Sequence, residues 1–183
     1  MTTYTQTSIP DTTTIGSSST DYIKGEKIAD TDSVFYGKTP TDAQFYLKKE
    51  NDPPSSTYTV SCVVVGDDST IKHTFWTKDI ADLPTVMTLT SESSIASTTA
   101  LAELDCIAIK IDPSPSNTFL RFGVDFTDVF DGVHSVYTGR QSDGEMRGFD
   151  DADVGFSITV AAAPSSATTL FPPPYANIGL HGL

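Results

Sequence analysis

TYTVSCVVV, residues 57–65, is the stretch that decides the fold, because apolar side chains recur at every second position along it. In an extended strand, alternate side chains point to opposite faces of the sheet. The face predicted to point into a core carries Tyr58, Val60, Cys62 and Val64. Similar apolar runs, separated by turn residues, cover residues 71–76, 104–111, 119–126 and 133–138. Short strands at this spacing are typical of an all-β antiparallel sandwich.

The length of 183 residues suits one such sandwich with a sizeable core. We predict three segments: an N-terminal arm rich in Thr and Ser (1–21), a sandwich of about eight strands (22–163) and a Pro-rich C-terminal arm (164–183). Residues 1–21 have few apolar side chains to bury. We therefore expect this arm to be disordered alone or to lie on a neighbouring subunit.

The charge of the chain limits its partners. Twenty-four acidic and 11 basic side chains give a net charge of -13, which repels a phosphate backbone and argues against direct nucleic-acid binding. No apolar stretch approaches the roughly 20 residues of a membrane span. Residues 1–14 lack the pattern of a secretory leader, so we expect a protein made in the cytoplasm without a signal peptide.

Two cysteines, Cys62 and Cys106, lie within predicted strands. They could face each other across the core and form a disulfide bridge in an oxidising compartment. The alternative is a pair of buried free thiols. The sequence leaves both interpretations open.

Catalytic signatures are not found. A Gly-x-Ser-x-Gly elbow and a phosphate-binding loop are missing, and His73, His134 and His181 have no supporting motif. We predict a protein that is not an enzyme and has no assigned metal site. One cofactor hypothesis remains, because carboxylates at the rim of a sandwich could bind calcium. The residues concerned are Asp125, Asp128, Asp131, Asp150, Asp151 and Asp153, for which the alternative is solvated negative charge.

Trp76 is the single tryptophan, and strict alternation along 71–76 puts it on the same face as Lys72. On an outward face its indole could stack on a sugar ring, whereas the alternative is a tryptophan that caps the core. Tyr137 and Arg140, which follow the Asp131-Gly132 hairpin signal, are further candidates for ligand binding.

The C-terminal arm combines a polyproline II segment with apolar side chains. Its prolines and aromatics fit a short pattern read by WW-type modules, but we prefer docking onto the sandwich or onto a neighbouring copy, because an exposed apolar arm favours aggregation. The predicted assembly contacts are Leu170, Phe171, Pro172, Pro173, Pro174, Tyr175, Ile178 and Leu180.

Three stretches, AQFYLKK (43–49), LAELDCIAIK (101–110) and VDFTDVFDGVHSVY (124–137), resemble a jelly-roll sandwich like those of carbohydrate-binding modules. Similar modules are accessory domains in surface and virion proteins. The likeness covers residues 23–160 and implies a non-catalytic binding or structural module.

The function that we predict is a structural protein of a virus particle or similar assembly, of the capsid, decoration or fibre type. The leaderless start and the two interaction-prone arms favour it, and the acidity suits the outer surface of a virion. Its partners would be other copies of itself or other structural subunits. The alternative is a carbohydrate-binding, lectin-like adhesion module whose partners are surface glycans.

Overall fold

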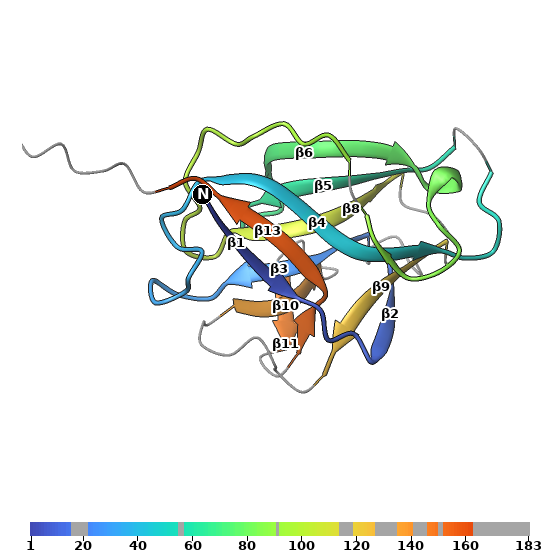
Figure 1. Cartoon of the computed structure of the whole chain (residues 1–183), viewed down its shortest axis with the longest axis horizontal. Coiled ribbons are helices and arrows are strands. Elements are labelled where there is room, and N and C mark those ends of the chain that lie inside the picture. The colour runs from blue at the N-terminus through green and yellow to red at the C-terminus, as the bar shows by residue number, and fades with distance from the viewer. Residues whose placement is uncertain are drawn as a thin grey trace, which may run out of the picture.

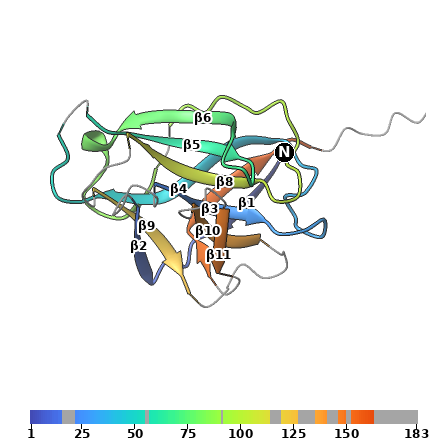
Figure 2. The same ribbon diagram turned by 180° about the vertical axis from the view of Figure 1, so that it is seen from behind.

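The computed structural model describes residues 1–15, 22–54, 57–90, 92–113, 119–126, 135–140, 146–149 and 152–162. In these residues the chain forms two facing antiparallel sheets, which confirms the all-β prediction (Figures 1 and 2). The described part holds 13 strands and one 3-10 helix, η1 (Ile80–Asp82), compared with the roughly eight strands expected for a jelly roll. The strands are β1 (Thr2–Gln6), β2 (Asp11–Ile15), β3 (Ile23–Ile28), β4 (Pro40–Lys49), β5 (Thr59–Val65), β6 (Ile71–Asp79), β7 (Thr88–Leu89), β8 (Cys106–Asp112), β9 (Leu120–Asp125), β10 (Ser135–Arg140), β11 (Met146–Phe149), β12 (Asp153–Val154) and β13 (Phe156–Val160).

One sheet has seven strands and the other has six. The seven-stranded sheet runs β1-β13-β4-β9-β12, with β2 paired to β9 and β7 paired to β4. The six-stranded sheet runs β11-β10-β3-β8-β5-β6 and is seen best from behind (Figure 2). First and last strands are neighbours, because β1 pairs with β13 from Thr2↔Val160 to Gln6↔Phe156.

The core lies between the sheets. On β5 and β8, the alternation of apolar side chains in the sequence predicts correctly which side chains point into this core. Val60, Cys62 and Val64 face inward, whereas Val63 and Val65 belong to a second apolar cluster on the other face. The largest fully buried side chains of the core are Phe35, Phe45, Phe75, Phe122 and Phe156. Burial of an aromatic side chain of this size contributes roughly 1.5–3 kcal/mol.

A β-bulge in β6 reverses the predicted orientation of Trp76. Cys62 lies opposite Trp76 and Val63 lies opposite Thr74, so Phe75 is an extra residue in the ladder. Such an extra residue lets two successive side chains point to the same side. Phe75 and Trp76 are accordingly both buried, and Trp76 does not share an outward face with Lys72.

The N-terminal arm is a second correction, because residues 1–15 are built into the seven-stranded sheet. Strand β1 pairs with β13, and β2 pairs with β9 over its whole length. Two apolar side chains attach this stretch to the core. Ile15 is fully buried, and the Tyr4 ring packs edge-on against Phe35 with ring centroids 5.2 Å apart. Backbone hydrogen bonds hold an edge strand that the Thr-rich composition alone does not distinguish from a disordered segment. Residues 16–21 lie outside the described residues.

The connection between β1 and β2 crosses the outer face of the seven-stranded sheet. There the Ile9 side chain covers Gly123 and Gly155, and a Cβ atom at position 155 would meet Ile9 Cγ2 at 2.3 Å. These two glycines make room for the connection. Residues 1–15 therefore contact both faces of the seven-stranded sheet. Tyr4 and Ile15 pack on the core face, and Ile9 packs on the outer face.

Candidate functional site

Trp76 does not offer its indole to a ligand. Only 4% of the residue is exposed, and Nε1 donates a hydrogen bond to the backbone carbonyl of Ala43 on the opposite sheet at 2.8 Å. The structure thus agrees with the interpretation that this tryptophan caps the core, and the sugar-stacking role is wrong.

The three predicted ligand-binding residues lie on two strands that are far apart in the sheet. Trp76 lies on β6, at one edge of the six-stranded sheet, and Tyr137 and Arg140 lie on β10, near the other edge. Four strand spacings of about 4.8 Å separate the two strands. Tyr137 is paired with Glu26 of β3, and Arg140 is paired with Met146 of β11.

Two of the six aspartates proposed for calcium are brought together. Asp125 and Asp153 lie directly opposite each other on β9 and β12, are 2% and 1% exposed, and Ser8 Oγ donates to Asp125 Oδ2 at 2.5 Å. The other four, Asp128, Asp131, Asp150 and Asp151, lie outside the described residues. Within the described part of the chain, no group of three or more potential ligands is placed to hold a metal ion. The calcium hypothesis stays a prediction.

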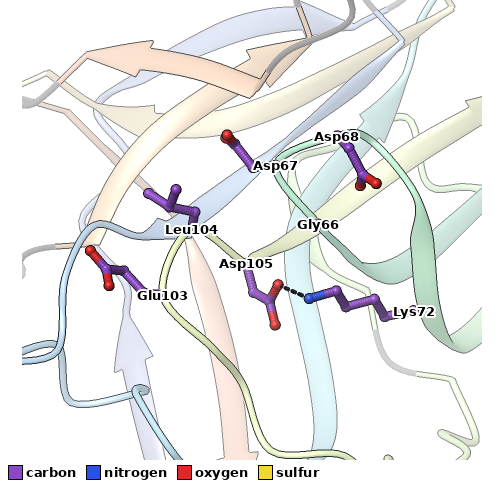
Figure 3. Close-up of a pocket in the computed structure, with 7 residues that line it drawn as sticks. All are labelled: Gly66, Asp67, Asp68, Lys72, Glu103, Leu104 and Asp105. Atoms are coloured by element: carbon purple, nitrogen blue, oxygen red, sulfur yellow. Dashed lines mark hydrogen bonds and ion pairs between the residues drawn. The ribbon is translucent and has the colours of Figure 1, made fainter.

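A surface pocket of about 490 Å³ lies at one end of the six-stranded sheet. The turn that joins β5 to β6 forms one side of it, and the loop before β8 forms the other (Figure 3). The turn is closed by hydrogen bonds from Gly66 N to Thr70 O and from Ser69 N to Gly66 O, each 2.9 Å long. The pocket is lined by Gly66, Asp67, Asp68, Lys72, Glu103, Leu104 and Asp105.

Both carboxylate oxygens of Asp105, the buried acid of the pocket, accept hydrogen bonds. Asp105 is 2% exposed, accepts a hydrogen bond from the Lys72 ammonium at Oδ1 and accepts another from Ala102 N at Oδ2, 2.9 Å away (Figure 3). Asp67 is paired with Lys27 in the same way. Each of these carboxylates is therefore charge-paired with a lysine.

The backbone N–H and the hydroxyl of Thr70 both donate to Asp68, at 2.9 Å, and lower the pKa of its carboxyl. The described lining contains no histidine, cysteine or serine; its ionisable groups are carboxylates and one lysine. What the pocket offers is an anionic, hydrogen-bonded surface whose charges are largely committed to the fold.

A different surface stands out by its lack of charge. Every Asp, Glu, Lys and Arg of the chain lies between Asp11 and Asp153. Residues 1–10 and 154–183 thus carry none of these side chains, and a strand from each stretch meets in the pairing of β1 with β13; Figure 1 shows the N-terminus beside the end of β13. We call these two strands, Thr2–Gln6 and Phe156–Val160, the neutral edge. The first charged residue of the next strand is Asp42, which lies opposite Thr159.

The positions of the charges are visible in the sequence, but the neutral edge was missed because nothing in the sequence pairs the first strand with the last. The predicted assembly contacts, Leu170 to Leu180, lie outside the described residues. The chain enters that segment from Ala161 and Ala162, directly after β13.

The cysteines are free thiols, in agreement with one of the two alternatives; a bridge across the core is not possible, because both belong to the same sheet. Cys62 faces the main core, whereas Cys106 lies in the cluster on the opposite face. The sheet itself separates the two sulfur atoms.

Comparison of the chain with models of protein families, with curated proteins and with solved structures finds no match in any of the three. In the described part of the chain, helices long and apolar enough to cross a bilayer are absent.

Proposed function

We propose that this chain is a structural subunit, without enzymatic activity, of a virus particle or similar assembly. In this proposal its contacts are made by the neutral edge and by the C-terminal segment 164–183. The observation that carries the proposal is the pairing of two strands without charged side chains, β1 and β13, at one edge of an otherwise acidic sandwich. The jelly-roll topology and a location on the outer surface of a virion belong to the same proposal.

Electrostatics supports a contact at this place. Copies that each carry a net charge of -13 repel one another, and the repulsion is weakest where no ionised side chain has to be desolvated. Strands β1 and β13 contribute only uncharged side chains to such a contact. An acidic outer surface keeps an assembled particle soluble, while a neutral edge lets its subunits meet.

The sequence of the C-terminal segment supports the same role. Its three consecutive prolines favour a preformed polyproline II conformation, which lowers the entropy lost on docking. Apolar side chains on both sides of the prolines, among them Leu170, Phe171 and Tyr175, could fill pockets on a neighbouring copy.

Deletion of residues 170–183 tests the proposal. We expect the shortened chain to keep the circular dichroism spectrum of the β-sandwich, because the described sheets end at Val160, but to lose assembly in negative-stain electron microscopy and sedimentation velocity. As a matched control, a chain in which Ser replaces only Asn177 and His181 should assemble normally. Particles formed equally well by the deletion variant would refute the role of the segment. A full-length chain that forms no particle, alone or with the other proteins of its native source, would refute the function.

A further inference from the structure

The outer edge of β1 has backbone groups that no described residue pairs with. Gly155 O accepts from Tyr46 N, and Ala161 N donates to Thr39 O, so the odd-numbered residues of this stretch direct their backbone groups toward β4. Since the direction alternates along a strand, residues 156, 158 and 160 face β1. Their partners there are Gln6, Tyr4 and Thr2.

The N–H and C=O groups of Thr3 and Thr5 therefore point away from β13, to the open side of the sheet. The side-chain contact between Thr3 and Thr159 is consistent with this alternation of backbone directions. Thr3 Oγ1 and Thr159 Oγ1 lie 2.9 Å apart, and side chains come closer in pairs that do not exchange backbone hydrogen bonds. In the described residues β1 is the last strand on this side.

Three other described edge strands, β6, β12 and β2, carry features that hinder strand addition. The edge strand β6 has two register shifts in its pairing with β5 and carries two lysines, Lys72 and Lys78. In addition, Ile95 N already donates a hydrogen bond to the carbonyl oxygen of Phe75. Strand β12 is only two residues long.

The edge strand β2 is protected in the same manner. It follows Pro10 and begins at Asp11, and the Lys24 ammonium donates a hydrogen bond to the carbonyl oxygen of Thr14 at 2.7 Å. Strand β1 has no proline, no charged side chain and no register shift. Compared with β2, β6 and β12, β1 is thus the edge strand that is left ready for pairing.

Strand β1 is also held in place before any partner arrives. Tyr4 packs against Phe35, the Thr3 and Thr159 hydroxyls are bonded, and Gln6 is 5% exposed with its side-chain oxygen accepting from Ser8 N at 2.8 Å. A preformed strand loses little conformational entropy when it adds to another sheet.

We propose that two copies of this chain pair through β1, antiparallel about a two-fold axis at Tyr4, so that their seven-stranded sheets become continuous. This inference deepens the proposed function, because it gives the neutral edge a defined partner. Thr3 of one copy lies opposite Thr5 of the other, and each such pair exchanges both of its backbone hydrogen bonds. An isologous contact of this kind closes after two copies.

A second copy is the occupant that the charges favour. In the paired arrangement β4, β13 and β1 of one copy meet β1, β13 and β4 of the other. The two Asp42 carboxylates are then five strand spacings, about 24 Å, apart. That is about three Debye lengths at physiological salt, so their repulsion is screened.

The first experiment measures the mass of the full chain by sedimentation equilibrium over a range of concentrations. We expect a monomer–dimer equilibrium. Thr5→Pro removes one outward N–H and should raise the dissociation constant at least tenfold, because proline at an edge keeps the pairing with β13 but blocks the added strand. Thr5→Val keeps the N–H and should leave the constant unchanged. Thr3→Lys, which places a charge on the edge, should also weaken the dimer.

The second experiment tests the register. An equimolar mixture of the Thr3→Cys and Thr5→Cys variants should form a disulfide-linked dimer on mild oxidation, because Cα atoms in such a pair are about 5.5 Å apart. Either variant alone should cross-link much less. A full chain that stays monomeric, a dimer unaffected by Thr5→Pro, or an inert mixture of the cysteine variants would overturn the inference.

These outcomes separate the inference from the proposed function. Particles that still form from Thr5→Pro subunits would leave the function standing and refute the β1 pairing in the assembly. A dimer that is sensitive to Thr5→Pro, in a chain that builds nothing larger, would support the pairing and refute the function. Loss of the dimer on deletion of 163–183, with no effect of Thr5→Pro, would assign the edge to the C-terminal segment and overturn the pairing.

Discussion

The indole Nε1 of Trp76 and the backbone carbonyl of Ala43 are joined by a 2.8 Å hydrogen bond that crosses the core from β6 to β4. The bulge at Phe75 makes this contact possible, because it turns Trp76 inward. A side chain of one sheet thus satisfies a backbone group of the other. The relative position of the two sheets is fixed by this polar contact in addition to apolar packing.

Trp76→Phe should lower the free energy of unfolding by about 2–3 kcal/mol, because the Ala43 carbonyl is left buried without its donor and indole volume is lost. Urea unfolding followed by circular dichroism measures the change. Phe75→Leu, at the neighbouring buried position, reduces volume without removing a hydrogen bond and should cost less. Equal costs for the two variants would contradict a contribution from the hydrogen bond.

Glu26 makes a second link between the sheets, since its Oε1 accepts from Val154 N at 2.6 Å and the residue is 1% exposed. Glu26→Ala leaves that N–H without an acceptor and should destabilise the fold by about 1–3 kcal/mol. Glu26→Gln keeps a carbonyl oxygen in the same place and should retain more of the stability. Thermal unfolding of both variants is the measurement, and a Gln variant that is less stable than the Ala variant would be the contrary result.

The sandwich could be predicted because β5 and β8 are long enough for a period of two to be recognised. On β8, Ile107, Ile109 and Ile111 face the core, as strict alternation requires. The orientation of Trp76 could not be predicted, because one inserted residue in β6 reverses it and leaves no mark in the composition. A bulge depends on the pairing of two strands, not on the residues of one strand.

The neutral edge could not be predicted for a similar reason. Residues 1–15 carry so few apolar side chains that local pattern favours disorder, and their strands exist because β13 and β9 offer backbone partners. Those partners lie more than 100 residues away in the sequence. Contacts of this separation are set by the topology of the whole domain.

Burial raises the pKa of the Cys62 and Cys106 thiols well above their usual range, with the negative charge of Asp42 adding to the effect at Cys62. Neither thiol should react with a thiol reagent at pH 8 in the native protein, and both should react once the chain is unfolded in denaturant without a reductant. A disulfide-bridged chain would instead release no thiol on unfolding.

The same shift makes stability depend on pH. Because the folded-state pKa of each thiol is raised, both states are protonated at low pH, and the unfolded chain ionises first as the pH rises. Stability should therefore fall as the pH increases above the ordinary thiol pKa of about 8.5. Chemical unfolding at a series of alkaline pH values should show a smaller decline for a Cys62→Ala variant than for the native chain.

Leu104, which lines the pocket, has a left-handed backbone with a φ of 67°. Two backbone hydrogen bonds hold it in this conformation. Leu104 N donates to Ile28 O, and Ile28 N donates to Asp105 O, both at 2.8 Å. This conformation costs a leucine roughly 1–2 kcal/mol, whereas asparagine tolerates it. With 39% of Leu104 exposed, Leu104→Asn loses little burial and should raise the free energy of unfolding by about 1 kcal/mol. Ile95→Asn, at a residue that is 67% exposed and has no positive φ, should bring no gain. Denaturant unfolding of both variants compares them, and an equal change at the two positions would mean that strain at Leu104 does not limit stability.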